Sequence, residues 1–384
     1  MTALLRVVLD QLVAPTDLDL ATATRELSRA LVATAPSGCA VEAIVPAASD
    51  VVATLEAAVP GLTDSTRTSL ARRELAAAWQ LGVVTGIGGG MIHSPTLLAP
   101  LVKHDRVHEN DQTVVTLWDL DAWQRPGELP RSVVGWHKAM LKRAAKHADA
   151  VVVPTHAAAE RLSELGPFGD RLRVIAGAPP AGFAVPTDEI GRRRALDVPD
   201  GCLVVAGSSA PSSRLRAAFA AVARSGADLP VVVLDVPEGD EAAVADLAAA
   251  GGLSESRVLV RGALADADRA AVLGGAVALL APSSLTAFPW RVVETLATGV
   301  PVVAADSPTH REIIVDGGLL VGTPDEADAG GADDVLADAL ADGLARVLGS
   351  TAAIERFAVL AGDRGRAFSW LGAAERVWQL HADL

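Results

Sequence analysis

Short apolar runs alternate with helical patterns along this chain, and the whole alternation occurs twice. An apolar run followed by apolar residues at helical spacing is typical of a βαβ unit, and successive βαβ units form a parallel sheet. In the first half the runs extend from 4–9 to 172–175, and in the second half from 203–206 to 300–304. We therefore predict an α/β fold of two doubly wound, Rossmann-like domains with parallel sheets.

The length and one loop-rich segment fix the expected domain boundaries. At 384 residues the chain is longer than most single hydrophobic cores support. Residues 176–201 are rich in Pro, Gly and charge, which is typical of a hinge. We predict an N-terminal domain over 1–180, a linker over 181–200 and a C-terminal domain over 201–362.

Composition argues against several classes of function. The net charge of −14 and the pI of about 5.0 lack the basic footprint that nucleic-acid binding requires. Aromatic residues make up only 3% of the chain, so base-stacking surfaces are scarce. The two cysteines, Cys39 and Cys202, are far apart and show no partner spacing. Neither a disulfide nor a thiolate metal site is indicated, and a reduced, cytoplasmic location fits best.

Targeting and catalytic signature motifs are also lacking. Arg6 and Asp10 interrupt the apolar N-terminal stretch, which favours a first strand over a signal peptide. No run approaches the roughly 18 to 20 apolar residues of a membrane span. HExxH, Gly-x-Ser-x-Gly and a P-loop lysine are absent, and the Gly-rich 86–95 is not GxGxxG leading into a helix. We expect a protein that is soluble, or at most peripheral at the inner face of the membrane, with no metal and no bound cofactor.

The segment 281–322 is the most informative part of the chain for function. It reads as a strand ending in Pro-Ser-Ser, a loop, a short helix that carries Glu294, a stop at Gly299 and a buried strand over 300–304. Such a unit places a loop and a helix N-terminus at the carboxyl edge of a parallel sheet. Open α/β folds bind ligands at that edge, and free backbone N–H groups there suit phosphate.

The same segment resembles the retaining nucleotide-sugar glycosyltransferases of family four, which have the two-domain GT-B fold. The family pattern runs Ser, two residues, Glu-Gly-Phe-Gly, three residues, a second Glu, a small helix and Gly-x-Pro-Val-Val. The positions in register are Ser283, Phe288, Glu294, Gly299, Pro301, Val302 and Val303. Phe368, Ser369 and Trp370 resemble the family's closing helix, so we expect residues 363–384 to return to the N-terminal domain.

The resemblance implies a reaction and its participants. A sugar would pass, with retention, from a nucleoside diphosphate sugar to a glycan or a lipid-linked acceptor in cell-envelope polysaccharide or glycolipid synthesis, without a metal. The N-terminal domain would face the acceptor and the C-terminal domain would bind the donor.

Donor binding is assigned by the same resemblance. Glu294 would accept hydrogen bonds from the two ribose hydroxyls, although a Glu near a helix N-terminus is also favoured by the helix dipole alone. Backbone groups of Ala287, Phe288 and Trp290 would meet the phosphates, with Arg214 or Arg291 as the cation. A solvated helix face explains the arginines equally well. Ser212 and Ser213 stand where the family often has Arg and Lys.

The sugar and acceptor side departs from the family pattern. Thr286 replaces the family's first Glu, and Trp118 replaces its His, while Asp119 remains. We assign Asp119, Trp118 and Thr286 as candidate catalytic residues. Thr cannot supply a negative charge beside an oxocarbenium ion, and Trp cannot accept a proton. His93 and Ser94 are candidate contacts to the sugar or acceptor, with a structural role for His93 as the alternative.

Residues 131–147, RSVVGWHKAMLKRAAKH, contain no acidic residue. Their apolar residues fall mainly on one helical face, which resembles a helix that lies on a membrane surface. A core-packed helix with a solvated basic face is the alternative, and it agrees better with the acidic chain. The segment could also meet a phosphorylated or lipid-linked acceptor.

Two hypotheses of different class follow. The first is a glycosyltransferase with an altered pocket. The second is a non-catalytic relative that keeps the fold and binds a partner or a glycan, because Trp118, Ser212, Ser213 and Thr286 all replace groups that the chemistry uses. The sugar, the nucleotide, the acceptor and the oligomeric state do not follow from the sequence.

Overall fold

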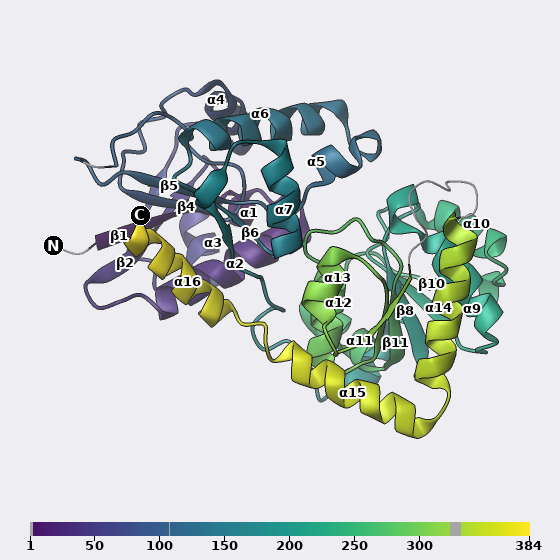
Figure 1. The fold of residues 1–384 in the computed structure, drawn as a ribbon. Helices are drawn as coiled ribbons and strands as arrows, with labels where there is room; N and C mark the ends of the chain where they lie inside the picture. The colour runs from purple at the N-terminus through teal and green to yellow at the C-terminus, as the bar shows by residue number, and fades with distance from the viewer. Residues whose placement is uncertain (1–2, 107, 323–331) are drawn as a thin grey trace. The chain divides into compact units, whose positions relative to one another are not determined.

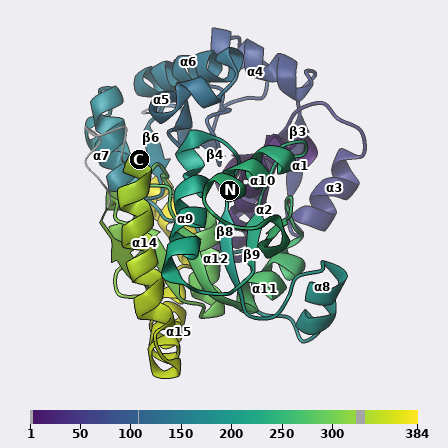
Figure 2. The ribbon, with the colours of Figure 1, turned by 90° about the vertical axis from the view of Figure 1, so that its right-hand side faces the viewer.

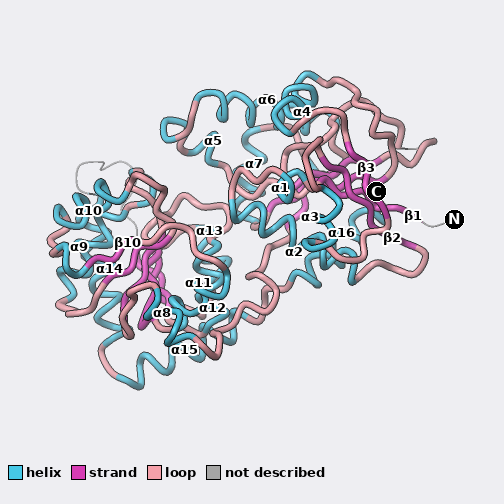
Figure 3. The backbone as a smooth tube through the Cα atoms, turned by 180° about the vertical axis from the view of Figure 1, so that it is seen from behind, coloured by secondary structure: helices cyan, strands magenta, loops and turns pink. Residues whose placement is uncertain are grey.

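The chain folds into two compact units (Figure 1). The computed structural model describes residues 3–106, 108–322 and 332–384. The N-terminal unit comprises Met1–Pro180 and Ser369–Leu384, and the C-terminal unit comprises Ala181–Phe368. In each unit helices surround a parallel sheet (Figure 3). The predicted class, α/β with two doubly wound sheets, is confirmed.

The sheet of the N-terminal unit has seven strands in the order β3-β2-β1-β4-β5-β6-β7, all parallel. Its strands are β1 (Ala3–Val8), β2 (Cys39–Val45), β3 (Asp64–Arg67), β4 (Met91–Ser94), β5 (Gln112–Thr116), β6 (Ala150–Val153) and β7 (Leu172–Val174). The inner strands β5 and β6 are buried along their full length. That burial explains the continuous apolar run of β6, and in β5 it encloses the polar Gln112, Thr113 and Thr116 as well.

Eight α-helices are described in the N-terminal unit. They are α1 (Asp10–Val13), α2 (Leu18–Ala33), α3 (Val51–Ala58), α4 (Arg72–Leu81), α5 (Asp121–Gln124), α6 (Arg131–His147), α7 (His156–Leu165) and α16 (Trp370–Asp383). The C-terminal helix α16 packs on α2, where Trp378 Nε1 donates to Leu31 O at 3.1 Å. Trp370 Nε1 donates to Pro179 O at 2.9 Å. These bonds join the last residues of the chain to the N-terminal unit.

The sheet of the C-terminal unit has six parallel strands in the order β10-β9-β8-β11-β12-β13. Its strands are β8 (Cys202–Ala206), β9 (Val231–Leu234), β10 (Val258–Val260), β11 (Ala276–Ala281), β12 (Val302–Ala305) and β13 (Leu319–Val321). Its helices are α8 (Glu189–Ala195), α9 (Leu215–Ser225), α10 (Glu241–Ala250), α11 (Asp266–Gly274), α12 (Trp290–Thr298), α13 (Pro308–Ile314), α14 (Ala332–Leu348) and α15 (Thr351–Gly365).

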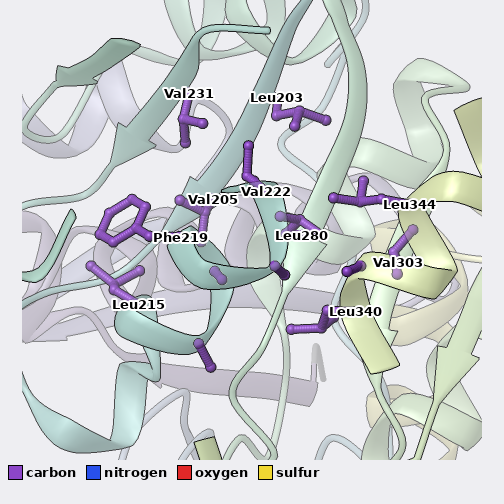
Figure 4. Packing of buried hydrophobic residues seen from close by; sticks show 14 of the residues in the cluster. Leu203, Val205, Leu215, Phe219, Val222, Val231, Leu280, Val303, Leu340 and Leu344 are labelled. Atoms are coloured by element: carbon purple, nitrogen blue, oxygen red, sulfur yellow. The ribbon is translucent and has the colours of Figure 1, made fainter. Parts of the chain in front are cut away.

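The core of the C-terminal unit lies between its sheet and the paired helices α9 and α14, which run side by side (Figure 2). The residues are aliphatic except for Phe219, as the composition requires. Figure 4 shows Leu203, Val205, Leu280 and Val303 of the strands packed near Phe219 and Val222 of α9 and Leu340 and Leu344 of α14. These residues are buried, and their packing holds β8 in place together with the loop that follows it.

The structure departs from the sequence-based prediction in two places. The edge strands β3 and β13 were not expected, because β3 is polar (DSTR) and β13 has only three residues. The segment 181–200, expected as a linker, falls in the C-terminal unit and forms α8, whose Arg193 is buried. The Ala/Asp-rich helix expected over 326–347 corresponds to α14, and residues 326–331 lie outside the described part.

Candidate functional site

The candidate donor site lies at the carboxyl edge of the six-stranded sheet. From β8 the chain runs outward to β9 and β10, and then returns to β11 on the other side of β8. Open α/β sheets bind ligands at such a reversal of strand order, outside the carboxyl ends of the strands. The loops 207–214 and 282–289, which follow β8 and β11, form this edge.

The loop after β8 is a tightly tied turn. Gly207 has a φ of +144°, and a Cβ there would lie 2.9 Å from Ser213 Cβ, so only glycine fits. Ser208 N donates to Ser213 Oγ at 3.1 Å. Ser209 N and Oγ both donate to the Asp240 carboxylate, each at 2.6 Å. The Ser213 hydroxyl thus holds the loop together at the position where the resembled pattern has a cation.

Glu294 sits on α12 and is 2% exposed. Arg269 of α11 donates to both of its carboxylate oxygens, from Nε to Oε2 and from Nη2 to Oε1, each at 2.8 Å. Arg291 Nη1 adds a bond to Oε2 at 3.0 Å. Arg269 is itself fixed by Asp266 Oδ1 at 2.9 Å and lies over the Phe183 ring at 5.6 Å. The expected ribose-binding carboxylate is therefore held by two arginines.

The two arginines expected at the phosphates are also ion-paired. Arg291 Nε donates to Asp235 Oδ2 at 2.6 Å. Asp235 directly follows β9 and has a positive φ of 61°, an uncommon conformation for a side chain other than Gly. Arg214, the N-cap residue of α9, donates to Asp333 Oδ1 of α14 at 3.2 Å. A solvated helix face does not describe Arg214 or Arg291, because each is ion-paired with an aspartate of another element. Ser212, two residues before Arg214, is buried.

The loop from Thr286 to Trp290 leads from β11 into α12. Ala287 and Phe288 are buried, and Thr286 and Trp290 are half-buried. The Phe288 and Trp290 rings meet edge-to-face with centroids 4.5 Å apart, which fixes the entry into α12. As expected, α12 ends at Gly299, which adopts the left-handed conformation of a helix C-cap.

Trp118 and Asp119 follow β5 at the carboxyl edge of the seven-stranded sheet. Trp118 is buried; its Nε1 donates to Pro95 O at 2.9 Å, and its ring meets Trp370 edge-to-face at 6.0 Å. Asp119 is half-buried, and its Oδ1 accepts from Asp121 N at 3.1 Å. Burial and the neighbouring Asp121 carboxylate raise the pKa of Asp119. Trp118 thus serves packing, whereas Asp119 retains a chemically useful carboxyl group.

His93 and Ser94 lie at the end of β4, and neither is exposed. His93 Nε2 is 3.5 Å from Thr116 Oγ1, and its ring meets that of His381 with centroids 5.6 Å apart. Burial, together with the nearby His381, holds the pKa of His93 well below its usual value. Ser94 Oγ donates to Leu98 O at 2.8 Å. The alternative for His93, a structural histidine, agrees with this burial.

Comparison with known proteins relates part of the chain to a protein family. The family model of Glycosyl transferases group 1 matches residues 203–348, which include the β8 loop, Arg269 and α12. The C-terminal part of the chain is thus similar to the group 1 glycosyl transferases. A phosphatidyl-myo-inositol mannosyltransferase of Mycobacterium leprae is 31% identical over 154 residues, which are 39% of this chain. That alignment spans 37% of the length of the mannosyltransferase.

Solved structures of other proteins share the fold over the whole chain. A sucrose-phosphate synthase from Thermosynechococcus elongatus has a TM-score of 0.71 at 18% identity, covering 99% of this chain and 98% of its own. The Anabaena protein HepE in complex with UDP and glucose has a TM-score of 0.71 at 17% identity, covering 100% of both chains. The expected resemblance to family four and its GT-B fold is confirmed.

Sequence reasoning missed two residues that the structure brings forward. Arg269 lies in ALADADR, which reads only as an amphipathic helix, so nothing in the pattern marked it as the partner of Glu294. Asp10 was read as an interruption of the first strand. It is fully buried at the carboxyl end of β1, is paired with Arg72 Nε at 2.7 Å, and its Oδ1 has no partner. Burial raises the pKa of Asp10.

The helix expected over 131–147 is α6. It buries Met140, Leu141 and Ala144 and exposes its lysines and Arg131, as the core-packed alternative requires. Arg143 is half-buried and donates to Leu101 O. None of the described helices is long and apolar enough to cross a membrane. In the described ranges no group of three or more His, Cys, Asp or Glu residues could hold a metal ion.

Proposed function

We propose that the chain is a glycosyltransferase that binds a nucleoside diphosphate sugar at the carboxyl edge of the six-stranded sheet and transfers the sugar with retention. The observation that carries the proposal is the Glu294 carboxylate on α12, the helix after the β11 loop, which accepts hydrogen bonds from Arg269 and Arg291. The family match to residues 203–348 supports it.

The Glu294 carboxylate can accept a further hydrogen bond from the sugar nucleotide. A carboxylate offers about four acceptor sites, and the arginines fill three of them, two on Oε2 and one on Oε1. The remaining site on Oε1 accepts one ribose hydroxyl. A second hydroxyl is accepted when Arg291 leaves Oε2, so ribose binding and movement of Arg291 are coupled.

Movement of Arg291 also supplies charge for the diphosphate. At rest its guanidinium is shared between Asp235 and Glu294, at 2.6 and 3.0 Å. A diphosphate beside the N-terminus of α12 competes for it through charge-assisted hydrogen bonds, which contribute about 1.5 to 3 kcal/mol each. The backbone of Ala287 to Trp290 and Arg214 complete this part of the proposed site.

For the reaction itself we propose Asp119 as the carboxyl group at the sugar, with Thr286 donating to a sugar hydroxyl and Trp118 shaping the wall. Ser94 and His93 lie behind that wall and position it. The acceptor is proposed to be a glycan or a lipid-linked molecule, and α6 would give peripheral membrane contact. The name of the Mycobacterium leprae relative, a phosphatidyl-myo-inositol mannosyltransferase, supports a glycolipid product.

The test is sugar transfer itself. The purified protein is incubated with a panel of nucleoside diphosphate sugars and with phosphatidylinositol or glycan acceptors, and release of the nucleoside diphosphate and the anomeric configuration of the product are followed by NMR. Release that needs both substrates, with a retained configuration, supports the proposal. Hydrolysis or transfer with inversion contradicts the retaining mechanism.

A non-catalytic, glycan-binding relative is the second candidate, and one observation favours it. Trp118 stands at the family's His position, and its only polar atom is bonded to Pro95 O at 2.9 Å. A general base is therefore missing there. Sugar-nucleotide binding without turnover by any member of the panel would favour this candidate.

A further inference from the structure

A cavity lies at the amino edge of the seven-stranded sheet, opposite the edge that carries Trp118 and Asp119. It has a volume of about 660 Å³ and is lined by residues of the loop before β5, by residues that lead into β6 and β7, and by Asp383 and Leu384. That volume falls within the range of small-molecule pockets, roughly 300 to 1,000 Å³. All of its lining residues belong to the N-terminal unit.

The lining is charged rather than apolar. Its cationic side chains are Lys103, His104, Arg106, Lys146, Arg171 and Arg173, and its side-chain carboxylates are Asp149, Asp170 and Asp383. The cations thus outnumber the carboxylates in a chain whose net charge is −14. A concave wall of one sign focuses the field and concentrates ions of the opposite sign. The cavity is therefore suited to a hydrophilic anion and not to an apolar ligand.

His104 is counted among the cations because of its hydrogen bonds. Its Nδ1 lies 2.9 Å from Val102 O and its Nε2 lies 2.7 Å from Asp149 Oδ2. A carbonyl oxygen and a carboxylate only accept, so the ring donates from both nitrogens and carries a positive charge. The hydrogen bond to Asp149 raises the pKa of His104 accordingly. This pairing neutralises Asp149, so its carboxylate does not compete with a bound anion for the other cationic side chains of the cavity.

The Arg171 side chain in the cavity wall is held in place by backbone carbonyl groups. Its guanidinium donates to the carbonyls of Ala145 at 2.7 Å and Ala148 at 2.8 Å, at the end of α6, and to Pro167 at 2.9 Å. It therefore cancels the partial negative charge that the C-terminus of α6 would direct at an anion. Lys103 and Lys146 are exposed at the same wall. Two exposed ammonium groups thus line the same cavity as the guanidinium of Arg171.

We propose that this cavity binds a phosphate-bearing anion, either a soluble phosphate ester or the headgroup of an anionic lipid. The fixed Arg171 orients the phosphate, and Lys103 and Lys146 close on it as point charges. The site is separate from the proposed donor site, since none of its residues belongs to the C-terminal unit.

The test compares two variants that lose the same charge. Lys103→Gln with Lys146→Gln alters the cavity, whereas Arg67→Gln with Arg73→Gln removes two exposed cations of the same unit that lie outside α6 and do not line the cavity. Inorganic pyrophosphate is titrated calorimetrically into the full chain and both variants. We expect roughly a hundredfold weaker binding in the cavity variant, because each charge-assisted contact contributes about a tenfold change. The control variant should bind like the original protein.

The source of the phosphate is resolved by a second arm with vesicles of phosphatidylcholine, with and without phosphatidic acid. Cavity-dependent binding to the acidic vesicles alone indicates a lipid headgroup, and cavity-dependent binding of pyrophosphate indicates a soluble ester. Equal binding of both probes by all three proteins would overturn the proposal, because the anion then binds elsewhere, for example at the donor site. Absence of binding by the original protein in both arms would overturn it as well.

Discussion

Arg269 holds Glu294 through two hydrogen bonds of 2.8 Å, one to each carboxylate oxygen. Both side chains are nearly fully buried, at 6% and 2% exposure. A buried carboxylate without such a partner would be neutralised or would open the fold. The pair therefore fixes a hydrogen-bond acceptor beside the carboxyl edge of the sheet, where the proposed donor lies.

Substitution of Arg269 by Met should destabilise the protein strongly. It leaves Glu294 buried with Arg291 as its one remaining ionic partner, and breaking a buried pair costs about 3 to 5 kcal/mol. The measurement is the free energy of unfolding in urea. Arg269→Met combined with Glu294→Leu should recover most of the loss, because no buried charge is then left uncompensated. A single variant as stable as the original protein would contradict the structural role of the pair.

Gly207→Ala should weaken donor binding and stability together. The added Cβ would lie 2.9 Å from both Cβ and Oγ of Ser213, at a φ of +144°. Strain of this kind costs about 1 to 3 kcal/mol. Gly191→Ala is the matched control, because a Cβ there meets nothing within 4 Å. Thermal unfolding of the two variants provides the comparison, and equal melting temperatures would argue against a strained loop.

The buried histidines should make the N-terminal unit sensitive to acid. Burial lowers the pKa of His381 from 6.5 to about 4, and it lowers that of His93 in the same direction. The unfolded chain therefore binds more protons below pH 6.5, and stability falls as the pH falls. For His381 alone the loss between pH 7 and pH 5 is about 2 kcal/mol.

His381→Gln tests that contribution, since the buried carboxyl groups titrate alike in both proteins. The variant also removes the ring that helps to lower the pKa of His93, and this change acts in the same direction. Urea unfolding at pH 7 and pH 5 should show a smaller pH dependence in the variant, by about 2 kcal/mol. An unchanged pH dependence would mean that His381 is not buried as a neutral ring.

Asp119→Asn should reduce turnover by about a hundredfold if Asp119 acts at the sugar, with little change in stability. Asp121→Asn offers a finer test. The Asp121 carboxylate contributes, after burial, to the raised pKa of Asp119, so its removal lowers that pKa. The acidic limb of the pH–rate profile should then move to lower pH. A shift to higher pH would show that another group controls the limb.

The fold could be predicted from the sequence because buried parallel strands are continuous apolar runs, as in β6, β9 and β12. The polar edge strand β3 carries no such run, and helix α8 lies in a segment whose Pro and Gly content resembles a linker. Local pattern identifies elements whose burial dictates their composition. It does not identify elements that tertiary pairing stabilises.

The candidate site was predicted less completely, for a related reason. The position of Glu294 followed from its motif, but its partner Arg269 lies 25 residues earlier on another helix, and only the fold brings the two together. Trp118 and His93 were considered as ligand contacts from their place after strands, yet both are buried. Whether a side chain at the end of a strand faces solvent or the interior depends on packing that one sequence does not reveal.

Calorimetric titration of the full chain with UDP, GDP, ADP and their sugar conjugates addresses the donor site most directly. The variants are Glu294→Gln, which keeps the shape but removes the carboxylate charge, and Glu255→Gln, which changes an exposed carboxylate of the same unit. Thermal unfolding checks that both are folded. We predict micromolar binding of at least one conjugate that Glu294→Gln loses and Glu255→Gln keeps. Binding by none of the conjugates, or binding that a folded Glu294→Gln variant retains in full, would contradict the proposed donor site.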